Sequence, residues 1–144
     1  MTARILVAPI AVAAAAVLTA CGGGGGETSE QARDRFYAAL DATQEALGGE
    51  WEVRDDTTAR GCSLPLWTDG QSYPGLRLGP MPDDVSAAVT TARDALRERG
   101  YDTTIGDVGT VAELRARGNG TEVITFRVAD DGMTLQGESD CRPR

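Results

Sequence analysis

The chain has 144 residues, with 14 arginines, 22 acidic residues and neither lysine nor histidine, so its formal net charge is −8. A surface this acidic excludes nucleic acid as an expected partner, because nucleic-acid binding requires basic residues that displace counterions. Without histidine or lysine the chain cannot form a Ser-His-Asp or Cys-His arrangement, a Schiff base, a Ser-Lys dyad or a P-loop, and it lacks the most usual zinc ligand. We therefore expect no metal, no cofactor and no catalytic residue of these kinds.

The first twenty residues have the layout of a secretory signal peptide. Arg4 supplies a positive charge near the N-terminus, and residues 5–20 contain no charged side chain. A helix over this apolar run would reach about 24 Å at ~1.5 Å per residue, short of a hydrocarbon core of roughly 30 Å, so a retained membrane span is the weaker interpretation. We expect residues 1–20 to be removed, which makes the mature chain one charge unit more negative.

Residues 18–21, Leu-Thr-Ala-Cys, resemble the bacterial lipobox at all four positions and lie where the apolar run stops. The resemblance implies that Cys21 accepts a diacylglycerol; the alternative is an ordinary cleaved signal with a coincidental cysteine. Five glycines follow over residues 22–26, a composition typical of a flexible tether. Residues 21–27 are thus interpreted as the lipidated cysteine and its tether, held permanently because two or three acyl chains bind far better than one.

The lipobox, the glycine tether and a following segment with a cysteine pair resemble the small actinobacterial lipoproteins called LppA-like. A chain rich in Arg, Ala and Gly but without Lys and His fits that source. The resemblance implies a lipoprotein, carrying palmitate-type acyl chains on Cys21, at the extracytoplasmic face of the cell membrane. It implies no particular activity, because the molecular role of that family is largely undefined. The acidic charge repels anionic headgroups, so the acyl chains must supply the attachment.

Residues 28–144 are enough for one domain and leave no room for a second. Once Cys21 is lipidated, Cys62 and Cys141 remain, and an oxidising compartment favours a disulfide between them; the alternative is two buried free thiols. In the chain-entropy model, a bridge closing a loop of about 80 residues stabilises the fold by roughly 4 to 5 kcal/mol.

An amphipathic helix is predicted over residues 28–47. Thr28 can cap the free amides while Gln31 reaches back in a capping box, and two glycines at 48–49 end the helix. Its apolar stripe follows the 3.6-residue period and comprises Ala32, Phe36, Ala39, Leu40 and Leu47. Alternation from Trp51 to Arg54 then predicts a half-buried strand that runs toward residue 58.

Residues 59–81 show no periodicity and are punctuated by proline and glycine, so we expect a long loop that is either functional or pinned in place. Trp67, Tyr73 and Leu76 are its candidate binding residues, because rigid aromatic side chains on a constrained loop offer contact area at low entropic cost. For Trp67 the alternative is a core position beside Cys62.

A second helix is predicted over residues 82–99. Pro82 suits its first turn, Asp83 and Asp84 complement the positive end of the helix dipole, and Gly100 ends it. Its expected buried stripe comprises Val85, Ala88, Val89, Ala92, Ala95 and Leu96.

Four strands are expected after it, over residues 101–105, 111–117, 122–128 and 133–138. Asn119-Gly120 and Asp131-Gly132 are expected to supply the positive φ angles of two-residue turns. Ile124, Phe126 and Val128 should share one face. The predicted fold class is α+β: a two-layer sandwich in which two helices pack on one face of an antiparallel sheet.

The acidic doublets at 55–56, 83–84 and 130–131 do not match the alternating pattern of a calcium loop, so we expect solvated or local structural roles for them. With 22 acidic residues, a glycosidase-type pair about 5 to 9 Å apart remains open, although no spacing selects one. We expect a non-catalytic binding or interaction module whose partner is an envelope protein or a small apolar ligand. The alternative is a carboxylate-dependent hydrolase acting on envelope glycans, which a deep cleft with two close carboxylates would favour over a shallow sheet surface.

Overall fold

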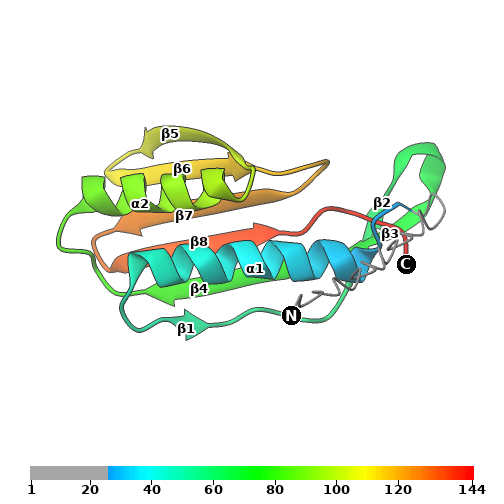
Figure 1. The fold of residues 1–144 in the computed structure, drawn as a ribbon, viewed down its shortest axis with the longest axis horizontal. Helices are drawn as coiled ribbons and strands as arrows, with labels where there is room; N and C mark the ends of the chain where they lie inside the picture. Colours follow the sequence, from blue (N-terminus) through cyan, green and yellow to red (C-terminus); the bar gives the residue numbers. More distant parts are fainter. Residues whose placement is uncertain (1–25) are drawn as a thin grey trace, which may run out of the picture.

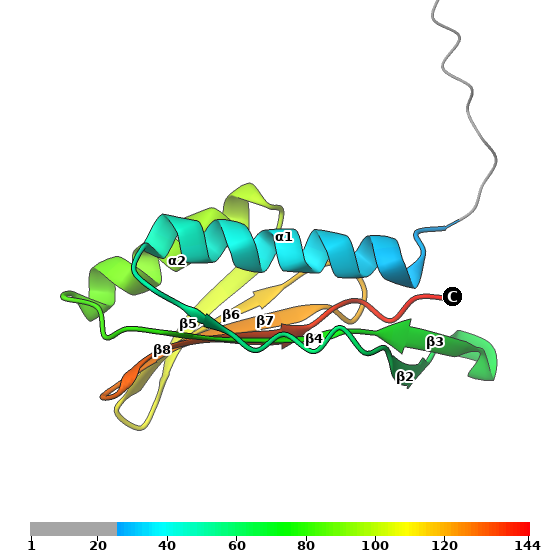
Figure 2. The same cartoon turned by 90° about the horizontal axis from the view of Figure 1, so that it is seen from below.

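The computed structural model describes residues 26–144. Two helices lie on one face of an antiparallel six-stranded sheet, which confirms the predicted two-layer α+β arrangement (Figures 1 and 2). No helix in the described part is long and apolar enough to cross a membrane. The predicted signal peptide, Cys21 and the glycines at 22–25 lie outside the described residues.

Helix α1 (Ser29–Leu47) begins and ends where the sequence predicts. The Thr28 hydroxyl accepts a hydrogen bond from the Gln31 N–H at 3.3 Å, and the Gln31 side-chain oxygen accepts one from the Thr28 N–H at 2.9 Å. Gly48, at φ +68°, follows the last turn. Phe36, with no exposed surface, projects from the buried stripe toward the sheet.

Helix α2 (Val85–Glu98) starts later than predicted, because Asp84 is its N-cap rather than a first-turn residue. The Asp84 carboxylate accepts a hydrogen bond from a first-turn backbone N–H at 2.9 Å. Val85 is consequently 37% exposed and is not part of the buried stripe. Gly100 ends the helix at φ +87°, while the Tyr101 N–H donates to the Leu96 carbonyl as in a Schellman motif.

The main sheet has the strand order β1-β4-β8-β7-β6-β5. Its last four strands in sequence are the predicted meander, and Ile124, Phe126 and Val128 face the helices together as expected. The strand predicted to run from residue 51 toward residue 58 is only two residues long. The strand bounds are β1 Glu52–Val53, β4 Pro74–Gly79, β5 Asp102–Val108, β6 Val111–Arg117, β7 Val123–Ala129 and β8 Gly132–Glu138.

Residues 59–81 are not the long loop that the sequence predicted. They form β2 (Arg60–Ser63), the 3-10 turn η1 (Pro65–Trp67) and β3 (Asp69–Ser72), followed by β4. β2 and β3 pair as a separate hairpin beyond the end of the main sheet, on the side of the molecule where the C-terminus lies (Figure 1).

Strand β4 was not predicted because its apolar residues point away from the core and its glycine and arginine point toward it. Gly75 and Arg77 face the helices, while Leu76 and Leu78 point to the opposite, helix-free face. The small inward residue is needed because a Cβ at position 75 would lie 2.5 Å from Leu40 of α1. The strand therefore lets α1 approach closely instead of contributing apolar side chains to the core.

The turns after β6 and β7 differ from their predicted geometry. Only the glycines, Gly120 and Gly132, have positive φ; Asn119 and Asp131 do not. The turn between β6 and β7 is longer than two residues, and the Gly118 N–H donates to a carbonyl at 3.0 Å to close it. The hairpin signals thus located the turns correctly but specified the wrong turn type.

Candidate functional site

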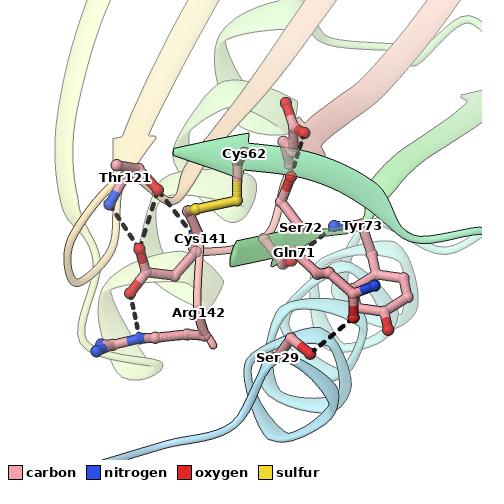
Figure 3. Close-up of a disulfide and its surroundings, with 11 residues drawn as sticks. Ser29, Cys62, Gln71, Ser72, Tyr73, Thr121, Cys141 and Arg142 are labelled. Carbon is pink, nitrogen blue, oxygen red and sulfur yellow. Dashed lines mark hydrogen bonds and ion pairs between the residues drawn. A yellow bond between two sulfur atoms is a disulfide. The ribbon is translucent and has the colours of Figure 1, made fainter. Parts of the chain in front are cut away.

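A disulfide joins Cys62 of β2 to Cys141 of the C-terminal tail, as predicted, with their Cα atoms 6.1 Å apart (Figure 3). The tail also pairs with β3, because the backbones of Arg142 and Gln71 exchange hydrogen bonds of 2.8 and 3.1 Å. The carbonyl of the next tail residue accepts from the Ser29 N–H at 3.0 Å. The tail therefore connects the hairpin to the start of α1.

A buried charged cluster lies at this same end of the molecule. The fully buried Glu122 carboxylate accepts hydrogen bonds from Arg35, at 2.7 Å, and from the Tyr101 hydroxyl, and Arg35 also binds Glu27. Burial and then the hydrogen bond to Glu122 raise the pKa of Tyr101 above its ordinary value, so the phenol remains a donor at neutral pH. Arg35 thus lies between two carboxylates, those of Glu122 and Glu27.

Asp140, beside the disulfide, is similarly engaged. Its carboxylate accepts from the Thr121 N–H at 2.8 Å and from the Thr121 hydroxyl at 2.9 Å (Figure 3). The Arg142 Nε lies 2.7 Å from its other oxygen, a close ionic contact in which these two atoms lack hydrogen-bond alignment. Asp140 therefore holds the turn before β7 against the tail.

On the helix-free face, Glu113 lies between two arginines. Its oxygens accept hydrogen bonds of 2.6 Å from Arg115 and from Arg127, and its side chain is almost fully buried. The hydrogen bond from Arg115, and then that from Arg127, lower the pKa of the Glu113 carboxyl. A carboxylate held ionised in this way is unsuited to donating a proton as a general acid.

The helix-free face also carries a shallow groove of about 460 Å³ across β4, β8 and β7. Leu76 and Val123 supply apolar lining, Thr125 and Gln136 supply polar lining, and Arg60 of β2 adds a charge at one side. A shallow sheet surface of this kind can contact an extended or loop segment of a partner over its length. It is the setting expected of a binding module.

A second cavity, of about 430 Å³, lies at the opposite end of the molecule from the disulfide, between the end of α1 and the start of α2. Leu47, Met81 and Met133 supply its larger apolar side chains. Asp84 also lines it, but its carboxylate caps α2. This cleft could hold a small apolar molecule.

The three candidate binding residues of the sequence are not brought together. Leu76 lines the groove, whereas Tyr73 is only 5% exposed: its backbone exchanges hydrogen bonds with Ser139, and the Arg33 guanidinium carbon lies 5.3 Å from its ring centroid. Tyr73 therefore offers no surface aromatic. The Trp67 side chain lies outside the described part of the structure, so its binding or core role stays a prediction.

The groove residues of β7 and β8 were not predicted as a site. Val123 and Thr125 alternate with the inward residues of β7 and so point outward, but only the pairing of β8 with both β7 and β4 places Leu76 beside them. The available signal was the mixed apolar and polar character of that outward face.

The first acidic doublet has a structural explanation. Asp55 accepts hydrogen bonds from the Arg77 guanidinium, at 2.7 Å, and from the Leu76 N–H, at 3.1 Å, while Asp56 accepts from the Thr58 N–H at 2.9 Å. Within residues 26–144, no three cysteine or acidic side chains cluster as metal ligands would.

No protein-family model matches the chain, and no curated protein matches it. Among solved structures, the crystal structure of a DUF4853 family protein from Actinomyces odontolyticus is similar, with a TM-score of 0.55 and 16% sequence identity. The match covers 81% of this chain and 66% of that one. At this level of identity the likeness shows a shared fold alone.

Proposed function

We propose that this chain is a lipid-anchored binding module at the extracytoplasmic face of the cell membrane, resembling the LppA-like lipoproteins. Acyl chains on Cys21 hold it there, and the helix-free groove binds an envelope protein. The lipobox at residues 18–21 and the glycine tether that follows it support the anchor.

The observation that carries the non-catalytic part of the proposal is the pairing of carboxylates with arginine. The three buried acidic side chains of the described residues, Glu113, Glu122 and Asp140, each lie 2.6–2.7 Å from a guanidinium nitrogen. A glycan hydrolase needs a carboxylic acid whose pKa is raised, and an adjacent arginine acts in the opposite direction. The groove also offers a shallow surface rather than an enclosed cleft around two carboxylates.

The anchor is tested by replacing its cysteine. Cys21→Ser should abolish incorporation of a fatty-acid probe and leave either unprocessed precursor or a shed soluble form, because the diacylglycerol has no thiol to join. Metabolic labelling followed by gel fluorescence measures this directly. Equal labelling of the variant and the wild type would contradict the anchor.

The groove is tested by photocrosslinking in live cells. A photoreactive amino acid at Thr125, inside the groove, should capture an envelope protein that affinity purification and mass spectrometry then identify. The same residue at Thr91, which lines the cleft between the helices, is the matched control, since both threonines are half-buried and line cavities of similar volume. Protein capture from Thr91 alone would move the site to the cleft, and capture from neither would remove the protein-binding proposal.

A further inference from the structure

The edge of the main sheet at β5 is open. β5 is last in the strand order, and no backbone hydrogen bond from another described segment reaches its outer side; Arg97 of α2 contacts only the Thr103 side chain, at 2.9 Å. It runs for seven residues, most of them exposed, whereas the edge strand at the other side, β1, has only two. Proteins usually protect so long an edge with charged side chains, proline or a bulge. β5 has neither proline nor a bulge, and Asp102 and Asp107 are its charged residues.

The unpaired backbone groups of this edge can be assigned. A two-residue turn joins β5 to β6, and the pair Val108 and Val111 closes it. The closing pair of such a turn is hydrogen-bonded, and hydrogen-bonded pairs alternate with non-bonded pairs along an antiparallel ladder. The N–H and C=O groups of Thr103, Ile105 and Asp107 therefore point away from β6.

We propose that this edge pairs with β5 of a second copy of the chain, antiparallel, about a twofold axis at Ile105. In that register Ile105 lies opposite Ile105 of the other copy, and Thr103 lies opposite Asp107. Every outward-facing residue thus meets an outward-facing residue, and each such pair exchanges two backbone hydrogen bonds. The remaining acidic residue, Asp102, lies opposite Val108, so no carboxylate opposes another.

Pairing also covers apolar surface. Ile105 is 50% exposed and Val108 is 57% exposed, so strand pairing at this edge would remove apolar surface from water. Ile105 stands beside the buried Leu114 of β6 and so lies on the helix side of the sheet, where α2 contacts β5. In the dimer the two isoleucines contact each other between the two α2 helices.

The symmetry is compatible with the proposed anchor, although the pairing does not depend on it. The twofold axis of an antiparallel strand pair is perpendicular to the sheet. Both helix layers therefore lie on the same side of the joined sheet (Figure 2 shows the two helices on one side of the sheet in a single copy). The start of α1 in each copy therefore lies on this same side of the sheet, although at opposite ends of the dimer, because rotation about the sheet normal reverses the direction of each helix. Confinement of two anchored copies to one membrane would raise their effective concentration further.

Cysteine crosslinking in membranes of cells expressing the full chain tests the register. Ile105→Cys should give a covalent dimer on mild oxidation, because a hydrogen-bonded pair with Cα atoms about 5.5 Å apart is within disulfide reach. Thr103→Cys alone should give none, since its two copies lie four residues apart along the pair. Coexpression of Thr103→Cys with Asp107→Cys should restore the dimer.

Sedimentation equilibrium of the purified mature chain in detergent tests the energetics. Ile105→Lys places two like charges at the twofold axis and should raise the dimer dissociation constant roughly tenfold. Val53→Lys is the matched control: Val53 is 53% exposed on the opposite edge, so the same charge change there should leave the dimer intact.

The proposal is overturned if neither Ile105→Cys nor the coexpressed pair forms a dimer in membranes. Self-crosslinking of Thr103→Cys would overturn the register. An Ile105→Cys adduct with a protein of different mass would show that a segment of another protein, rather than a second copy, occupies the edge. Equal weakening by Ile105→Lys and Val53→Lys would mean that charge, not edge pairing, controls association.

Discussion

At the residue scale, arginine replaces the missing histidine and lysine as the partner of nearly every buried charge. Arg77 is the clearest case: it is 3% exposed on the inward face of β4, and its guanidinium contacts Asp55 at 2.7 Å, Asp41 at 2.6 Å and Gln44 at 3.1 Å. A planar guanidinium can satisfy several acceptors at once, which a lysine at this position could not do with the same geometry. At β4, ion pairs of Arg77 therefore form part of the contact between helix and sheet. At β6 to β8, apolar side chains form it.

Glu113 makes the acid stability of the fold testable. Its pKa is lowered from 4.5 by hydrogen bonds from Arg115 and Arg127, so the folded state favours the ionised form. The resulting stability is fully present above the unfolded pKa and is lost as the pH falls through the lower folded pKa. Glu113→Gln should therefore be less stable than wild type at neutral pH, and the difference should shrink below about pH 4.

Chemical denaturation of both proteins at a series of pH values measures this difference. Glu98→Gln on the exposed side of α2 serves as the control, because Glu98 makes no ion pair among the described residues. A stability difference for Glu113→Gln that is constant across the acid range would show that lost packing, rather than ionisation, explains the effect.

At the scale of elements, local signals predicted the helices and the C-terminal meander well. The capping box at Thr28 and the apolar stripe containing Phe36 are readable because helix capping and burial depend on residues three or four apart. The strands around Phe126 are readable because their inward positions are apolar on a period of two. In both cases the side chains to be buried follow from the geometry of the helix or strand to which they belong.

The strands within residues 59–81 could not be predicted from local pattern, because distant parts of the chain determine which residues face inward. The inward positions of β4 are glycine and arginine, chosen by the closeness of Leu40 and by the ion pairs of Arg77, while its leucines point outward. No local sequence rule distinguishes a strand with such inward residues from a Gly-rich loop, because the residues of α1 determine which side chains fit at these positions. The groove was missed similarly: Leu76 was selected as a loop residue, but its neighbours Val123 and Thr125 come from a strand more than forty residues later.

At the scale of the whole molecule, the disulfide stabilises the end of the domain at which α1 begins. Cys141 fixes the tail, the tail carbonyl contacts the Ser29 N–H at the start of α1, and Asp140 holds the turn before β7. The bond therefore connects the hairpin, the C-terminal tail and, through the tail, the start of α1. Cys62 lies on the β2–β3 hairpin, which is not paired with the main sheet. Loss of the bond should affect these regions unequally.

We predict that Cys62→Ser combined with Cys141→Ser lowers the free energy of unfolding by roughly 4 to 5 kcal/mol, the loop-closure entropy of a bridge between residues 79 apart. The melting temperature should fall by well over 10 °C, since each kcal/mol is worth about 4 °C or more in a domain of this size. Hydrogen exchange should accelerate most in β2, β3 and residues 139–143, and then at the first turn of α1, because these segments can open locally once the bond is lost. β7 keeps its ladder to β6 and β8, so its exchange should accelerate only through the fall in the global free energy of unfolding. Uniform acceleration across β7 and the hairpin would instead mean that the bond supports one cooperative unit, and recovery of both cysteines as free thiols from wild-type protein made under oxidising conditions would remove the bond itself.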